Sequence, residues 1–160
     1  MTDSHSAEHI VAQLKQQKLT IATAESLTAG MLSSRIADVA GASAVLHGGV
    51  VAYNNTIKHR LLGVSADTLA ARGAVDSETA KQMARGARDR FGSDLGIATT
   101  GVAGPEPSEG KAVGIVFIAL ATPDETLAKL VRFDGTRDKI RRSTVAASLK
   151  LVAEWLEQRG

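Results

Sequence analysis

The 160-residue sequence contains no cysteine, which excludes disulfide bonds, thiolate metal sites and a cysteine nucleophile. It has only five aromatic residues (three Phe, one Tyr and one Trp), so few side chains can stack on nucleic-acid bases. No apolar run approaches the roughly 18 residues of a membrane-spanning helix. The polar first eight residues do not form a secretion signal. These absences predict a cytoplasmic protein that binds neither membranes nor nucleic acid.

The charge is nearly balanced, because 19 Lys and Arg against 17 Asp and Glu give a formal net charge of +2. Such a weak positive charge suits a small anionic ligand better than nucleic acid. Hydrophobic residues make up 44% of the chain and charged residues 22%, which is ordinary for a globular protein. The length predicts a single domain over residues 1–160, with residues 1–7 flexible.

Apolar spacing predicts helices that alternate with strands. Helices are expected over 5–17, 27–39, 56–62, 65–71, 77–91 and 136–158, and strands over 19–24, 46–53, 94–100, 112–121 and 126–133. Residues 101–111 hold two prolines and three glycines without periodicity, which indicates a loop. The last two strands flank a Thr-Pro-Asp-Glu turn and are expected to be antiparallel. The pattern favours a layered α/β/α domain with a mixed, mostly parallel sheet that ends in an antiparallel hairpin.

Two of the predicted strands end at a small hydroxyl residue and run into glycine. These segments are Thr20-Ile-Ala-Thr-Ala-Glu-Ser26-Leu-Thr28-Ala-Gly30 and Leu95-Gly-Ile-Ala-Thr-Thr100-Gly101-Val-Ala103-Gly-Pro105. Open α/β sheets bind ligands at the carboxyl ends of their strands, so both hydroxyls are expected at one site. Ser26 is also predicted to open a helix, whose free N–H groups would face the same reacting carbonyl. The alternatives are a simple helix cap at Ser26 and a simple turn after Thr100.

A nucleophilic serine needs a base, and the G-x-S-x-G context of a histidine triad is absent. Lys58 is the candidate: if Asn55 caps a short helix, Lys58 lies in its first turn. There the helix dipole and partial burial would both lower the pKa of the amine. The alternative is a solvated lysine. Tyr53 ends the preceding strand and is expected either at the same crevice or in the core with a polar tip.

Two further clusters have an ordinary interpretation as well as a functional one. His5-Ser-Ala-Glu8-His9 matches the H-x-x-E-H pattern of zinc peptidases, but it lies at a terminus without a third ligand, so we interpret it as a solvated helical turn. Basic residues gather at the start of the last predicted helix: Arg132, Arg137, Lys139, Arg141 and Arg142. They form either a solvated face or a phosphate site at a helix N-terminus that Arg142 reaches.

A resemblance to a known family rests on segments found in order between about residues 8 and 157. They are Thr23-Ala-Glu-Ser-Leu-Thr-Ala-Gly30, Gly48-Gly-Val-Val-Ala-Tyr-Asn-Asn-Thr-Ile-Lys58, Leu62-Gly-Val, Gly73-Ala-Val, Thr100-Gly-Val-Ala-Gly-Pro105 and Val113-Gly-Ile-Val-Phe. Together they closely resemble the CinA C-terminal domain family, whose active members are nicotinamide-nucleotide amidases of the PncC type. The resemblance implies hydrolysis of nicotinamide mononucleotide to nicotinate mononucleotide and ammonia in pyridine nucleotide salvage, without a metal or other cofactor. The chain resembles the stand-alone amidase, because the pyrophosphatase-like domain of full CinA proteins is absent from the sequence.

The resemblance also implies roles for individual residues. Ser26 matches the nucleophile, Lys58 the base and Thr100 a hydroxyl that supports both. Substrate contacts are implied for Tyr53, Gly101 and Ala103, a close backbone approach is expected at Thr28 and Gly30, and Arg142 is assigned to the 5′-phosphate.

The sequence departs from the family pattern at residues 105–110, Pro-Glu-Pro-Ser-Glu-Gly, where a second glycine pair is common, and at Ala112, where proline is common. These departures affect substrate fit. They leave open a module that binds a nucleotide or a protein without turnover. The alanine-rich helices suggest a homo-oligomer, such as a dimer.

Overall fold

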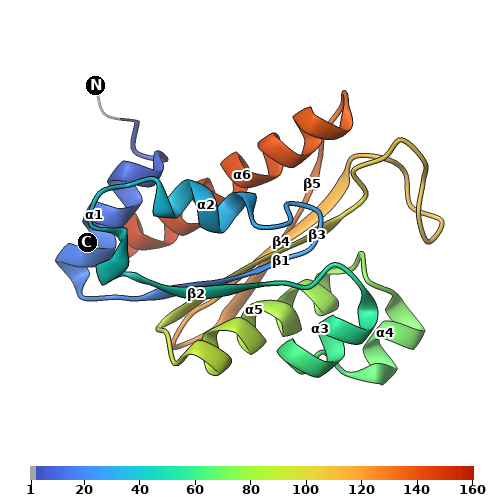
Figure 1. Ribbon diagram of the computed structural model, residues 1–160, viewed down its shortest axis with the longest axis horizontal. Helices are drawn as coiled ribbons and strands as arrows, with labels where there is room; N and C mark the ends of the chain where they lie inside the picture. The colour runs from blue at the N-terminus through green and yellow to red at the C-terminus, as the bar shows by residue number, and fades with distance from the viewer. Residues whose placement is uncertain (1–2) are drawn as a thin grey trace.

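The computed structural model describes residues 3–160 and places a five-stranded sheet between two layers of helices (Figure 1). The strands are β1 Ile21–Glu25, β2 Leu46–Val51, β3 Leu95–Gly101, β4 Ile115–Ala121 and β5 Thr126–Arg132. The helices are α1 Ala7–Gln17, α2 Met31–Ala37, α3 Asn55–Leu62, α4 Ala66–Arg72, α5 Ser77–Phe91 and α6 Arg137–Arg159, with a short 3₁₀ turn at Ala42–Ala44. No helix within residues 3–160 is long and apolar enough to cross a membrane.

The strand order is β2-β1-β3-β4-β5. β1 pairs in parallel with β2 and β3, whereas β3–β4 and β4–β5 are antiparallel. The α/β fold, the mixed sheet and the hairpin are therefore confirmed, with two parallel and two antiparallel pairs. The carboxyl ends of β1, β2 and β3 meet at one edge of the sheet, as parallel strands require.

Side chains of different size cover the two faces of the sheet. Large aliphatic residues such as Ile21 and Ile97 pack against α1, α2 and α6, whereas alanines such as Ala22 and Ala98 pack against α5. The small residues let α5 approach closely: a Cβ added to Gly96 of β3 would lie 2.0 Å from the carbonyl oxygen of Ala84. Because successive side chains of a strand alternate between faces, Thr100 lies on the α5 side with Ala98.

Most predicted boundaries agree with the structure to within a few residues, and α5 agrees at both ends. One difference affects the site: the helix predicted over 27–39 begins only at Met31, with Gly30 as its N-cap. Ser26 therefore does not open a helix. Residues 1 and 2 of the predicted flexible start lie outside the described residues. Ser6 already caps α1 and Ala7 is fully buried.

Candidate active site

Ser26 follows the last residue of β1 and continues the parallel pairing by one hydrogen bond. Its N–H donates to the carbonyl oxygen of Thr99 at 2.9 Å. Its side chain is 9% exposed. The serine is thus held at the carboxyl end of the central strands, where binding crevices of open sheets lie.

The turn after Ser26 is held from behind by the buried carboxylate of Glu25. That carboxylate accepts hydrogen bonds from the Thr28 hydroxyl at 2.7 Å, from the N–H groups of Leu32 (2.7 Å) and Ser33 (3.0 Å), and from the Ser33 hydroxyl at 2.5 Å. Gly30 has no side chain that could cap α2. Glu25 therefore caps this helix in place of the N-cap residue, and the first-turn N–H groups of Leu32 and Ser33 are unavailable to a substrate.

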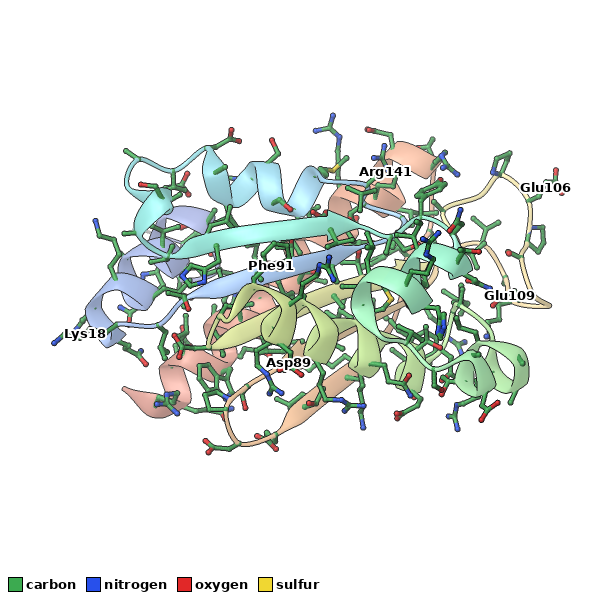
Figure 2. All side chains as sticks on the ribbon, turned by 60° about the horizontal axis from the view of Figure 1, so that its bottom comes forward. Lys18, Asp89, Phe91, Glu106, Glu109 and Arg141 are labelled. Carbon is green, nitrogen blue, oxygen red and sulfur yellow. The ribbon has the colours of Figure 1, made fainter. Side chains whose placement is uncertain are left out.

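A second clamp on the same turn comes from α6. The Arg141 guanidinium donates to the carbonyl oxygens of Leu27 at 2.8 Å and Thr28 at 3.2 Å. Arg141 and the loop residues Glu106 and Glu109 all lie toward the same end of the molecule, far from Lys18 (Figure 2). Arg141 thus fixes the backbone next to Ser26 and is itself occupied by carbonyl oxygens.

Lys58 reaches Ser26 from α3. The N-cap of this helix is Asn54, one residue earlier than expected, and its side chain accepts from the N–H of Ile57 at 2.9 Å. Lys58 is 1% exposed, and its Nζ donates to Ser26 Oγ at 3.2 Å and to the Ala52 carbonyl oxygen at 2.9 Å. Of the two alternatives that the sequence left open for this lysine, the structure shows the buried one.

Burial lowers the pKa of Lys58 to about 8, and the nearby Glu109 carboxylate opposes that effect. Desolvation is the main cause because an ammonium loses its hydration in a buried position. A lysine with such a pKa exists partly as the neutral amine near neutral pH. The neutral amine can accept a proton from Ser26 while it still donates to Ala52.

Ser26 and Lys58 open into a cleft of about 470 Å³, within the size range of ligand sites. The cleft is lined by Ser26, Leu27, Tyr53, Asn54, Asn55, Lys58, Ala74, Val75, Thr100, Gly101, Val102, Ala103, Gly104, Glu106, Ser108, Glu109 and Arg137. These residues come from segments far apart in the sequence. The structure therefore brings the two hydroxyl-ended strands to one site, as expected.

The remaining candidates from β1 and β3 divide into two groups. Thr100 lines the cleft, but its hydroxyl donates to the Ala74 carbonyl oxygen at 2.7 Å and not to Ser26 or Lys58. Gly101 and Ala103 also line the cleft. Thr28 and Gly30 do not; they build the turn behind Ser26 through the contacts of Glu25 and the left-handed backbone of Gly30.

Tyr53 and Arg137 meet at the cleft. Tyr53 is 57% exposed, so it is not a core residue. Its hydroxyl accepts from Arg137 Nη2 at 2.7 Å, and Arg137 Nη1 donates to the Gly104 carbonyl oxygen at 2.5 Å. Arg137 is the first residue of α6. It thereby joins the segment before α3 to the loop after β3.

Arg142, which the sequence assigns to a phosphate, is not among the cleft residues. It pairs with Asp138 at 2.8 Å and lines a different depression with Met31 and Arg35. Five residues along a helix rotate the side chain by about 140°, so Arg137 and Arg142 cannot share a face. Arg137, and not Arg142, is the arginine that lines the cleft.

Glu109 was not predicted from the sequence as a site residue, and neither were the particular contacts of Arg137 and Arg141. Glu109 lies in an aperiodic loop, and the arginines were visible only as a cluster. A helical wheel anchored at the Thr136 cap could have separated the faces of Arg137 and Arg142. Within residues 3–160, no three His, Cys, Asp or Glu side chains are grouped as metal ligands.

Comparisons with known proteins match one family over nearly the whole chain. The family described as "CinA C-terminal domain" matches residues 3–156. A relative from Desulforamulus reducens, named for competence-damage inducibility, is 50% identical over 156 residues, covering 97% of this chain and 38% of that protein. A CinA-like protein from Frankia casuarinae is 48% identical and is matched over 34% of its length. The chain thus spans less than two fifths of these curated relatives.

Two solved structures match nearly the full length of the chain. The competence/damage inducible protein CihA from Agrobacterium tumefaciens has a TM-score of 0.90 at 36% identity, over 96% of this chain and 94% of that one. A CinA superfamily protein from Klebsiella pneumoniae has a TM-score of 0.92 at 30% identity, over 98% and 99%.

Proposed function

The chain belongs to the CinA C-terminal domain family, and we propose that it is an amide hydrolase that converts nicotinamide mononucleotide to nicotinate mononucleotide and ammonia. One observation carries the proposal. Lys58 Nζ lies 3.2 Å from Ser26 Oγ in a buried position that lowers the lysine pKa to about 8. Serine activated by a neutral lysine is a recognised nucleophile for acyl transfer.

In the first half of the proposed reaction, Ser26 Oγ attacks the carboxamide carbon and its proton passes to the neutral Lys58 amine. The tetrahedral intermediate then expels its nitrogen as the C–N bond breaks. The Lys58 ammonium returns the proton to that nitrogen, so ammonia leaves and an ester on Ser26 remains. A base with a pKa near the working pH serves both transfers.

In the second half, a water molecule attacks the ester carbon and gives a proton to Lys58. The ester C–O bond then breaks, Lys58 reprotonates Ser26 Oγ, and nicotinate mononucleotide leaves. Lys58 stays in place during both halves because its second hydrogen bond, to the Ala52 carbonyl oxygen at 2.9 Å, does not involve the substrate.

The negative oxygen of each tetrahedral intermediate needs a hydrogen-bond donor. The backbone N–H of Leu27 has no partner within residues 3–160, and Leu27 lines the cleft next to Ser26. We assign this N–H as an oxyanion donor, a role worth roughly 3 kcal/mol per donor in known enzymes. Arg141 supports it, because it holds the carbonyl oxygens of Leu27 and Thr28.

The opposite wall of the cleft suits a phosphorylated substrate. Arg137 donates one hydrogen bond from Nη1 to the Gly104 carbonyl oxygen and one from Nη2 to the Tyr53 hydroxyl. Its remaining N–H groups are available to a phosphate. The exposed ring of Tyr53 offers a surface for the pyridinium ring, since a cation is attracted to the face of an aromatic ring. Thr100 supports the site indirectly, because its hydroxyl holds the carbonyl oxygen of Ala74, which lines the cleft beside Lys58.

The test is ammonia release from nicotinamide mononucleotide by the wild type, Ser26→Ala and Lys58→Met. Both variants are expected to lose at least about a thousandfold in kcat. Ser34→Ala on the exposed side of α2 and Lys81→Met on α5 are matched controls, because neither residue lines the cleft. Unchanged turnover in Ser26→Ala or Lys58→Met would reject the mechanism. Tight nucleotide binding by a wild type that releases no ammonia would favour the alternative of a binding module.

A further inference from the structure

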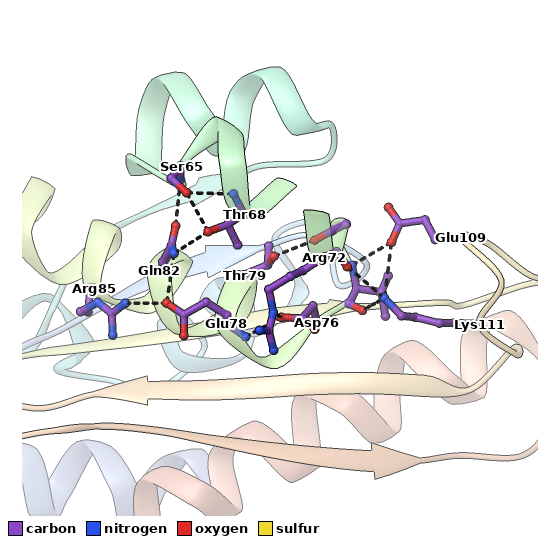
Figure 3. A network of polar contacts seen from close by, with 12 residues as sticks. Ser65, Thr68, Arg72, Asp76, Glu78, Thr79, Gln82, Arg85, Glu109 and Lys111 are labelled. Carbon is purple, nitrogen blue, oxygen red and sulfur yellow. Dashed lines mark hydrogen bonds and ion pairs between the residues drawn. The ribbon is translucent and has the colours of Figure 1, made fainter. Parts of the chain in front are cut away.

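One wall of the cleft is made by two segments without regular structure, residues 102–114 after β3 and the connector 73–76 between α4 and α5. Glu109 joins them: its carboxylate accepts from the N–H of Ala74 at 2.9 Å and from the N–H of Val75 at 3.1 Å. Figure 3 shows Glu109 and Lys111 of the loop beside Arg72 and Asp76. Because each carboxylate oxygen binds one of two consecutive N–H groups, the distance and the orientation of the loop relative to the connector are both fixed. The Glu109 carboxylate is therefore a joint, that is, a hydrogen-bonded link between the two segments.

The backbone on both sides is built for this joint. Glu109 has a φ of 54°, a left-handed conformation that is unfavourable for a residue with a Cβ. Gly73 has a φ of 80°, which favours glycine, and a Cβ there would lie 2.5 Å from Glu109 Oε2, so the carboxylate would have to shift. Lys111 adds a second fastening, since its Nζ donates to the carbonyl oxygens of Arg72 and Val75 and lies 3.8 Å from Glu109 Oε2.

The residues that Glu109 holds lie next to the Ser26–Lys58 pair. The peptide groups around Ala74 are held on both sides: the N–H by Glu109 and the carbonyl oxygen by Thr100 at 2.7 Å. Ala74 and Val75 line the cleft together with Lys58. A shift of Glu109 would therefore move the wall against which Lys58 is buried.

Glu109 also acts through its charge, which raises the pKa of Lys58 against the effect of burial. The other titratable or charged groups on the elements around Lys58 are Glu25, Tyr53, His59, Arg60, Arg72, Asp76, Glu106, Lys111 and Arg137. Several are engaged elsewhere: Glu25 caps α2, His59 bonds the Val64 carbonyl oxygen and Arg72 pairs with Asp76. Glu109 is the carboxylate whose charge raises the pKa of Lys58.

We propose that Glu109 is a positioning residue of this site, which fastens the 102–114 loop to the connector behind the Ser26–Lys58 pair and presents a negative charge to that pair. The kinetic consequence rests on the proposed function, whereas the effect on Lys58 itself does not. By favouring the ammonium, Glu109 keeps a proton available for the leaving nitrogen. By holding the connector, it keeps Thr100 and Lys58 in register.

The first test needs no substrate. Lysine side chains labelled with ¹³C at Cε are titrated by NMR, and Lys58→Met assigns the Lys58 signal. In Glu109→Gln the titration of Lys58 is expected to move down by at least about half a pH unit, because an opposite charge is lost. Glu106→Gln removes the same charge from the same loop without the two backbone contacts, and is expected to leave the titration in place. An unmoved Lys58 titration in Glu109→Gln, or an equal movement in both variants, would overturn the proposal.

The second test uses turnover. In Glu109→Gln the acidic limb of the kcat profile is expected to move to lower pH, with kcat at its plateau falling between about tenfold and a hundredfold from lost positioning. Glu109→Asp keeps the charge, so its acidic limb should stay near that of the wild type while its plateau still falls. Coincident profiles for wild type and Glu109→Gln would contradict the positioning role. If the wild type deamidates no nucleotide, the proposed function fails, and the NMR titration still decides the role of Glu109.

Discussion

Replacement of the buried Lys58 by methionine is expected to stabilise the protein while it abolishes turnover. The side chain is 1% exposed, and burial has lowered its pKa from the ordinary 10.5 to about 8. The pKa difference of about 2.5 corresponds to about 3–3.5 kcal/mol of destabilisation near neutral pH, at about 1.4 kcal/mol for each pKa unit. Methionine has a similar length and no charge to desolvate.

Not all of this free energy is recovered in the variant. The Ala52 carbonyl oxygen loses the donor that now lies 2.9 Å away, which costs about 1 kcal/mol. The net stabilisation at pH 7 is therefore about 2 kcal/mol. For a chain of this size it corresponds to a rise in Tm of roughly 4–8 °C.

The effect has a definite dependence on pH. Below about pH 8, Lys58 is charged in both the folded and the unfolded chain, and the full destabilisation applies. Between about 8 and 10.5 the unfolded chain binds a proton that the folded chain does not, so the stability of the wild type rises with pH. The advantage of Lys58→Met should shrink across this window and reverse at its upper end.

Urea unfolding at pH 7, 8, 9 and 10 measures the difference, with Lys81→Met as a control that is expected to stay within about 0.5 kcal/mol of wild type. A Lys58→Met protein less stable than wild type at pH 7 would refute the reasoning. So would a difference in stability that stays constant from pH 7 to pH 10.

Three further substitutions test other parts of the account. Glu25→Gln should destabilise the fold by about 2–4 kcal/mol in urea unfolding, because a buried group that accepts four hydrogen bonds gains an N–H donor without a partner. The control Glu8→Gln, at an exposed position, should cost less than about 1 kcal/mol. Equal losses in the two variants would contradict the capping role of Glu25. Gly86→Ala should lower the free energy of unfolding by about 1–3 kcal/mol, since a Cβ would lie 1.9 Å from the Leu62 carbonyl oxygen. A rise in stability, as alanine usually gives in place of glycine within a helix, would show that α3 and α5 are not so close. Arg137→Ala should raise KM for the nucleotide about tenfold or more with little change in Tm. Arg142 pairs with the exposed Asp138 and does not line the cleft, so Arg142→Ala should leave KM unchanged. The reverse order would restore Arg142 as the phosphate ligand.

Local pattern was sufficient for the elements whose signals lie within them. The helix over Ser77–Phe91 agrees at both ends because Asp76 caps it and Gly92 adopts the left-handed conformation that stops it. The hairpin between β4 and β5 follows from the turn residues between two apolar runs. The carboxyl-end positions of Ser26 and Thr100 follow from strand ends and glycines, so their meeting at one cleft was predictable from the sequence.

The start of α2 was not predictable, because its cap comes from Glu25, a residue that belongs to the preceding strand. No local rule connects a strand carboxylate to N–H groups of Leu32 and Ser33. Glu109 was missed for the same physical reason. Its partners Ala74 and Val75 lie more than 30 positions away along the chain, and the loop that carries it has no period to interpret.

Cleavage of the amide through an ester on Ser26 is tested most directly by trapping that ester. Hydroxylamine competes with water for an acyl-enzyme, so wild type mixed with nicotinamide mononucleotide and hydroxylamine should yield the nicotinic hydroxamate nucleotide together with ammonia. Ser26→Ala should yield neither product above the uncatalysed rate. Ammonia release at the wild-type rate by Ser26→Ala, or wild-type turnover without hydroxamate at any hydroxylamine concentration, would contradict the account.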